Sequence, residues 1–208
     1  MENIRFEIKI ISDGNRELTE DEKYFLKNLL SNSLHFSNMG DDLVPDRSII
    51  STKPGVEARA LGGSLGIGEG PGGDSTERKF DDFFREYFSE GCYLWVEAME
   101  KGEVFEPLIW APYSAERRDW LYMYGKLENG GLPCGMTSVD GRLSVFAELD
   151  SNFTMIFGEK NEVLKFDSKF GGRQRLRSDF VEFCRESEVN FGHGNIYGYL
   201  EKYVSQLV

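Results

Sequence analysis

The side chains suited to nucleophilic catalysis are a few cysteines and histidines. Cys134 lies in a Pro-Cys-Gly stretch, and His193 lies between two glycines that would expose its ring. Because the members of a thiol–imidazole dyad can be far apart in sequence, a Cys134/His193 pair stays open. No nucleophile motif surrounds Cys134, however, and no Gly-x-Ser-x-Gly elbow for serine chemistry occurs. His35 is expected at the end of a helix, where the helix dipole accounts for it.

Motifs for metals and cofactors are equally sparse. The three cysteines are too widely spaced for the close pairs of a structural zinc site. Asp41, Asp42 and Asp46 lack the loop spacing and the terminal glutamate of an EF-hand. The letters Gly-x-Gly-x-x-Gly at 68–73 lack the preceding strand and following helix of a dinucleotide site. We therefore expect no metal and no cofactor.

One arrangement of carboxylates and a lysine does point to an enzyme. Asp150 ends a predicted strand, and Asp167-Ser168-Lys169 lies near the end of a neighbouring one. This order resembles the PD-(D/E)xK nuclease pattern, in which two carboxylates hold Mg²⁺ and the lysine helps to orient the attacking water. The resemblance lacks the Pro-Asp element and implies, as an alternative function, a metal-dependent nuclease. Six nearby cations would meet phosphates: Lys160, Lys165, Lys169, Arg173, Arg175 and Arg177.

The remaining feature is the distribution of acidic residues, which gather in a loop and around a predicted turn. Acidic patches raise the rate of association with basic targets and can mimic the phosphates of a nucleic acid. Two aromatic residues beside Pro112, in a predicted loop, are expected to supply desolvated anchors. The expected protein-binding residues are Asp41, Asp42, Asp46, Glu97, Glu100, Glu103, Glu106, Trp110 and Tyr113.

The elements that must position these residues follow from periodicity and from turn residues. Thr19 and Glu22 form a capping box at the start of a helix, and Gly91 closes a later one. Seven glycines within 62–73 break any helix or strand period, so that the surrounding segment reads as a loop. The elements expected in the first half are a strand over 4–10, a helix over 19–36, a long loop over 38–75 and a helix over 75–90.

The second half reads as a mixture of hairpins and helices. Pro107 is expected to bend one strand and to place it at a sheet edge. The expected elements are strands over 92–98 and 104–110, a short helix after Ser114, strands over 142–149, 153–157 and 163–166, and helices over 178–186 and 196–207.

This order predicts an α+β fold, because the strands form hairpins rather than alternating regularly with helices. We expect a single domain over 1–208, with an antiparallel or mixed sheet packed by several helices and the Gly-rich loop over 38–75 inserted. Hydrophobic residues make up 40% of the chain and aromatic residues 13%, which excludes global disorder. The odd number of cysteines and the absence of a signal peptide favour a cytoplasmic protein with reduced thiols.

Charge completes the functional prediction. With 36 Asp and Glu against 24 Lys and Arg, the net charge of −12 disfavours nucleic-acid binding over the whole surface, and no membrane span is present. By class, a small acidic chain without a catalytic motif is similar to bacterial immunity proteins. That resemblance implies a non-enzymatic inhibitor that neutralises a basic toxin or nuclease by occlusion. The alternatives are the nuclease described above and a small-molecule binding domain whose Gly-rich loop forms a lid.

Overall fold

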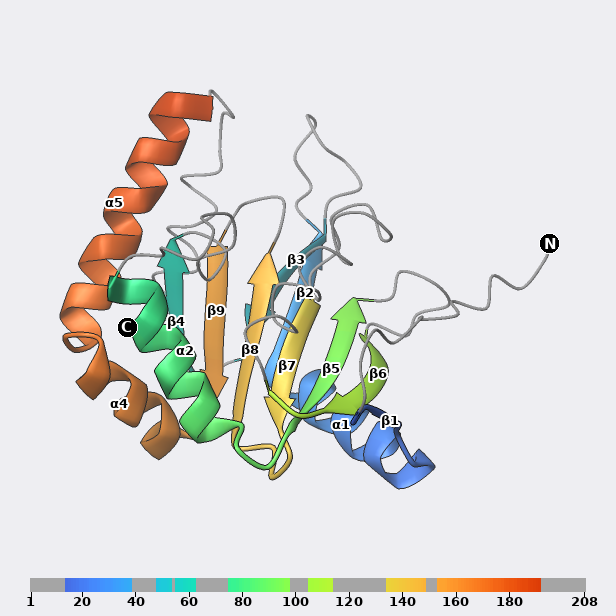
Figure 1. Cartoon of the computed structure of the whole chain (residues 1–208). Helices are drawn as coiled ribbons and strands as arrows, with labels where there is room; N and C mark the ends of the chain where they lie inside the picture. The colour runs from blue at the N-terminus through green and yellow to red at the C-terminus, as the bar shows by residue number, and fades with distance from the viewer. Residues whose placement is uncertain are drawn as a thin grey trace.

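The structure, a computed structural model, describes residues 14–38, 48–53, 55–62, 75–97, 105–113, 134–148 and 153–191. Its centre is a seven-stranded sheet in the order β1-β6-β5-β7-β8-β9-β4, and every neighbouring pair is antiparallel (Figure 1). These strands are β1 (Arg16–Glu17), β4 (Glu57–Gly62), β5 (Cys92–Glu97), β6 (Phe105–Ala111), β7 (Cys134–Ser138), β8 (Leu143–Glu148) and β9 (Phe153–Gly158).

A separate two-stranded sheet and four helices complete the described part of the chain. The small sheet pairs β2 (Leu34–Asn38) with β3 (Ser48–Thr52). The helices are α1 (Glu20–Ser33), α2 (Ser75–Tyr87), α4 (Lys160–Lys169) and α5 (Arg173–Phe191). The predicted α+β class with an antiparallel sheet is therefore confirmed. Within the described residues, no helix has the length and apolar character needed to cross a membrane.

Helix α1 begins at the predicted capping box. The Thr19 hydroxyl accepts a hydrogen bond from the Glu22 backbone N–H, and the Glu22 carboxylate accepts one from the Thr19 N–H at 2.9 Å. The helix ends at Ser33, three residues before the predicted end, because the chain passes at Leu34 into β2. Leu26, Leu30 and Leu34 are buried, so the predicted core-facing side of the helix is correct.

The prediction of one continuous loop over 38–75 is wrong, since β3 and β4 lie inside that range. Strand β4 pairs with β9 along its whole length and forms one edge of the large sheet. Its apolar side is made of two alanines, Ala58 and Ala60, and its other side carries Arg59. Because alanine side chains are small, the alternation of apolar and polar residues in this strand was too weak to predict it.

The strand predicted over 163–166 is also wrong, because these residues belong to α4. Val163 and Phe166 are buried at the three-residue spacing of a helix face, and Leu164 is exposed. The helix predicted over 178–186 is confirmed but starts earlier, at Arg173. Helix α2 is confirmed but ends at Tyr87, three residues before the predicted end. Four of the five aromatic residues predicted to face the core are buried: Phe80, Phe83, Phe84 and Phe88.

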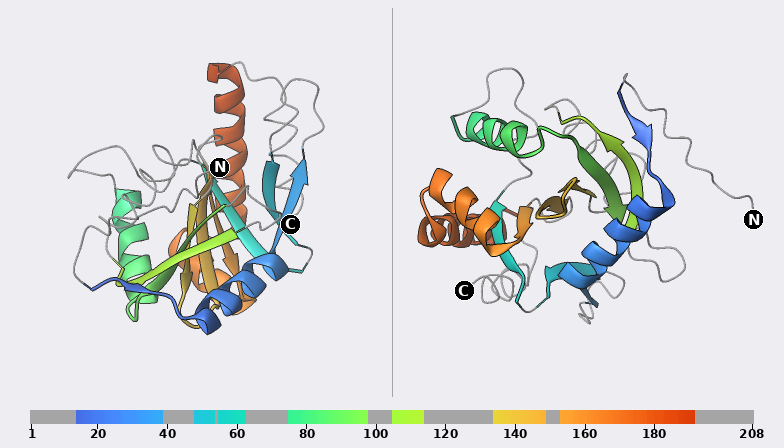
Figure 2. Two further views of the ribbon diagram at one scale, coloured as in Figure 1. Left: turned by 90° about the vertical axis from the view of Figure 1, so that its right-hand side faces the viewer. Right: turned by 90° about the horizontal axis from the view of Figure 1, so that it is seen from below.

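Hydrophobic cores lie on both faces of the large sheet. Figure 2 shows α2 and α4 on one side and α1 on the other. On the first side, aromatic rings of α2 stack on those of α4, as with Phe80 and Phe166 at 5.9 Å between ring centroids. On the second side, leucines of α1 pack with Trp95 and Phe146. The sheet thus lies between the layer of α2 and α4 and helix α1.

Strand β6 is irregular at its proline, as predicted. Leu94 pairs with Ile109, but Trp95 pairs with Pro107, so Leu108 is an extra residue in the ladder. The strand is not the outermost one, because β1 pairs with it at Ile109 and Trp110. Several predicted elements lie outside the described residues: the strand over 4–10, the helix after Ser114, the helix over 196–207 and most of the Gly-rich segment at 62–73.

Candidate protein-binding surface

Two of the predicted acidic residues are brought together by the β5–β6 pair. Glu97 pairs with Phe105, and Glu106 pairs with Val96, so both glutamates lie where the two strands meet their connection. Glu100 and Glu103 belong to that connection, which lies outside the described residues. The same holds for three predicted aspartates: Asp41, Asp42 and Asp46. The structure therefore describes two residues of one predicted acidic group, Glu97 and Glu106, and none of the other group.

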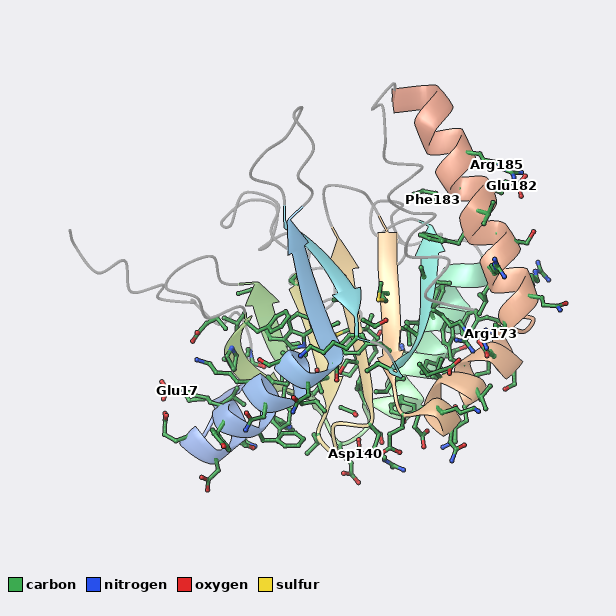
Figure 3. The ribbon with its side chains drawn as sticks, turned by 180° about the vertical axis from the view of Figure 1, so that it is seen from behind. Glu17, Asp140, Arg173, Glu182, Phe183 and Arg185 are labelled. Atoms are coloured by element: carbon green, nitrogen blue, oxygen red, sulfur yellow. The ribbon has the colours of Figure 1, made fainter. Side chains whose placement is uncertain are left out.

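Further carboxylates that the sequence reasoning had not assigned to binding join Glu106. Strand β1 pairs with β6 and leads directly into the acidic first turn of α1. Glu17, Glu20 and Asp21 are exposed there, and Figure 3 shows Glu17 beside α1. Helix α1 also contacts β6. We call the four exposed carboxylates at this end of the sheet the acidic edge: Glu17, Glu20, Asp21 and Glu106.

Two lysines of α1 show that these carboxylates share one environment. Lys23 Nζ lies 2.8 Å from Glu20 Oε1, and Lys27 Nζ lies 3.8 Å from Glu106 Oε2. The hydrogen bond to Glu20 raises the pKa of Lys23, and the charges of Glu106 and Glu17 add to this effect. These ion pairs are exposed, and such pairs contribute little to stability and exchange readily for other partners.

The end of β1 is held to α1 by a stronger ion pair. Arg16 donates two hydrogen bonds to the Glu22 carboxylate, at 2.8 and 2.6 Å. The Tyr93 hydroxyl donates a third, at 3.3 Å. The hydrogen bonds from Arg16, together with those from Thr19, lower the pKa of Glu22 to about 2 against the opposing effect of burial. The Glu22 carboxylate is therefore occupied by hydrogen bonds that join β1 to α1, whereas the four carboxylates of the acidic edge stay exposed.

Trp110 lies beside the acidic edge, within β6 rather than in the predicted loop. It pairs with Arg16 of β1, whose guanidinium carbon stands 5.2 Å from the indole centroid. The indole is partly buried and lies against Gly91, where a Cβ would come within 2.4 Å of the ring. The left-handed backbone of Gly91, with φ +99°, also favours glycine. Trp110 is therefore held by Gly91 and Arg16 on a strand that is paired on both sides.

Tyr113 lies away from Trp110. Its ring packs against Phe84 of α2 and against Phe88 in the turn after that helix, with centroids 6.1 and 5.8 Å away. Trp110 packs instead with the core on the α1 side of the sheet. The structure thus assigns the two predicted anchors to different sides of the sheet, and only Trp110 adjoins the acidic edge.

The residues of the nuclease resemblance do not have the arrangement that the pattern requires. Asp167 and Lys169 lie on helix α4 rather than on a strand, and Asp150 lies outside the described residues. The buried Asp167 carboxylate accepts two hydrogen bonds from Arg59, at 2.7 and 2.6 Å. Lys169 donates to Glu86 of α2. The Asp167 carboxylate therefore holds α4 against β4.

The remaining catalytic and metal candidates gain no support from the described geometry. Cys134 is buried in the core between the sheet and α2, and His193 lies outside the described residues. Among the residues that the structure describes, no group of three His, Cys, Asp or Glu side chains is placed to hold a metal ion.

A scan against protein-family models, a search of the curated proteins and a search of the solved structures found no match to this chain.

Proposed function

We propose that this protein is a non-enzymatic, cytoplasmic inhibitor of the immunity type, which occludes a basic toxin or nuclease by binding it at the acidic edge. The observation that carries the proposal is the convergence of β1, α1 and β6. These three elements gather Glu17, Glu20, Asp21 and Glu106 at one end of the sheet, next to Trp110. Glu97 ends the neighbouring strand, β5.

The physical role of the carboxylates is to guide the partner. Exposed charges are screened beyond about 8 Å at physiological ionic strength, so a compact group of like charges acts mainly on the final approach. Because Glu20 and Glu106 are 88% and 49% exposed, both remain available to a lysine or arginine of a partner. The existing lysine partners would be exchanged at little cost.

High affinity requires an anchor residue that loses its water on binding, and we assign this role to Trp110. Tryptophan is among the residues most often found at the energetic centre of protein interfaces. The indole is partly exposed, and its orientation is fixed by Gly91 beneath it and Arg16 above it. A fixed side chain loses little conformational entropy on binding. An acidic rim around an aromatic anchor is the arrangement that this proposal requires.

The proposal is tested by capture from a lysate of the native host, with the full chain immobilised. Three baits are compared: the wild type, the edge variant Glu17→Lys/Glu20→Lys/Glu106→Lys, and a control variant Asp82→Lys/Glu90→Lys/Glu182→Lys. The control changes the net charge equally on exposed residues of α2, the turn after it and α5. Circular dichroism confirms that all three are folded.

We expect the wild type and the control to capture the same basic protein, and the edge variant to lose it. Purified chain should then inhibit the activity of that protein stoichiometrically. Equal capture by all three baits would contradict the proposed surface. Cleavage of DNA or RNA by the chain itself with Mg²⁺, abolished by Lys169→Ala at an exposed position, would replace the proposal with the nuclease alternative.

A further inference from the structure

The end of the sheet opposite the acidic edge carries a surface of the other sign. It is formed by α4 and the first turns of α5, which are joined by a short turn at 170–172. We call it the basic surface. Its six cations are all exposed: Lys160, Lys165, Lys169, Arg173, Arg175 and Arg177.

Both carboxylates in the same stretch of chain are removed from this surface. Asp167 is buried against Arg59, and Glu162 is buried with its carboxylate facing Lys165 at 2.6 Å and Arg142 at 3.4 Å. Over residues 160–177, the exposed charges are therefore all positive. Exposed carboxylates flank this stretch at Glu159 and Asp179, and Glu86 of α2 pairs with Lys169.

Folding accounts for Lys165, which pairs with the buried Glu162 carboxylate, but not for the cations at the start of α5. The first turn of α5 contains no acidic residue and carries Arg173 and Arg175. The helix dipole disfavours positive charge there by roughly 0.3–1 kcal/mol per residue at exposed sites. The partners of Lys169 and Arg175 are Glu86 and Asp179, which are themselves 74% and 61% exposed. Exposed pairs of this kind stabilise a fold little and open easily to a competing anion.

The other exposed side chains identify the kind of anion. Asparagine, serine and glutamine are common donors to phosphate oxygens, and three such residues are exposed here: Asn161, Gln174 and Ser178. A protein interface needs aromatic or aliphatic anchors, but Leu164 is the single exposed large hydrophobic residue described on these two helices. Polar donors without apolar anchors match a sugar–phosphate backbone better than an acidic protein.

We infer that the basic surface binds the phosphate backbone of a nucleic acid, without sequence specificity. The negative charge elsewhere does not prevent this, because exposed charges more than about 8 Å away are largely screened at physiological salt. The inference is independent of the proposed partner, since the acidic edge lies at the far end of the sheet. In Figure 3, Glu17 and Arg173 lie at opposite sides of the molecule.

The test is fluorescence anisotropy of the full chain with labelled single-stranded DNA and RNA of mixed sequence, each about 20 nucleotides long. If three to six phosphates are neutralised, binding weakens about 20- to 300-fold between 50 and 200 mM salt. The variant Lys160→Glu/Arg175→Glu/Arg177→Glu should bind more than about tenfold more weakly than the wild type. These positions avoid the contacts that Lys165, Lys169 and Arg173 make with neighbouring elements.

The matched control is Lys23→Glu/Lys27→Glu/Arg85→Glu, which changes the net charge equally on α1 and α2. It should keep the wild-type affinity within about twofold, as expected for charges beyond the screening length. The inference fails if the wild type does not bind either oligonucleotide at 50 mM salt, or if both variants lose binding equally. Displacement of the oligonucleotide by polyglutamate at equal charge concentration would also overturn it, in favour of an acidic protein as ligand.

Discussion

At the scale of single residues, the buried charge of Arg59 is the feature that most needs polar partners. Its guanidinium is 3% exposed and donates to both oxygens of Asp167, to Glu57 and to the Ala58 carbonyl. Each of these bonds compensates part of the cost of removing a cation from water. The pair joins α4 to β4, two elements that sequence patterns alone did not identify.

Asp167→Asn should destabilise the protein by about 3–5 kcal/mol, because Arg59 would stay buried without its carboxylate. The double variant Arg59→Met/Asp167→Leu should cost less than the sum of the single variants, since it removes both charges. Urea unfolding followed by circular dichroism measures these free energies. A loss below about 1 kcal/mol for Asp167→Asn would show that the pair is not needed for folding.

Glu22 gives a prediction about pH. Its pKa of about 2 in the folded protein lies below the ordinary value of 4.5, so its ion pair with Arg16 stabilises the fold above pH 4.5. That contribution is lost as the pH falls from 4.5 towards 2. Because Arg16 is 47% exposed, solvent screening limits the contribution to about 1 kcal/mol.

Glu22→Gln should therefore lower the free energy of unfolding at pH 7 and have little effect near pH 2.5. Urea titrations at several pH values measure the difference between the variant and the wild type. Glu20→Gln, in the same helical turn but 88% exposed, is the control and should change little at any pH. A constant difference for Glu22→Gln across this range would contradict the assigned pKa.

At the scale of elements, local signals were predicted well and tertiary ones poorly. The capping box of α1 and the aromatic face of α2 each depend on residues that are close together in the sequence, and both are confirmed. The residues of α4 suited a strand equally well, because Val163, Leu164 and Phe166 are compatible with either period. Only the packing of Phe166 on Phe80 and of Asp167 on Arg59 decides for a helix.

The candidate surface was predicted in the same uneven way. The hairpin that joins Glu97 to Glu106 follows from neighbouring strands, so their proximity was foreseen. Glu17 was missed because β1 joins β6 across most of the first half of the chain, and no local pattern signals such a pairing. Trp110 and Tyr113 were expected together, but β6 continues to Ala111 and their side chains diverge.

Strand β7 offers a test of close packing between elements. A Cβ at Gly135 would lie 2.2 Å from the indole of Trp95, which is fully buried and donates a hydrogen bond to Thr137 at 3.0 Å. Gly135→Ala should displace the indole, weaken that bond and cost about 1–3 kcal/mol. Urea unfolding and tryptophan fluorescence measure the two effects. Unchanged stability together with an unchanged emission spectrum would contradict this packing.

At the scale of the whole molecule, the described residues form two surfaces of opposite charge at the two ends of the sheet. The acidic edge lies at the β1 end and the basic surface at the β4 end, where α5 contacts β4 (Figure 1). The core between them contains buried aromatic residues on both faces of the sheet. A molecule built in this way presents two independent charged surfaces, so mutations at one should leave binding at the other unchanged.

The central claim is that the acidic edge guides a basic partner and that Trp110 anchors it. Stopped-flow kinetics with the captured partner tests both parts in one measurement. The variant Glu17→Lys/Glu20→Lys/Glu106→Lys should slow association several-fold and flatten its salt dependence while dissociation changes less, and Trp110→Ala should mainly speed dissociation. Association that is unchanged in rate and in salt dependence would contradict the claim and leave the acidic edge as ordinary solubilising surface.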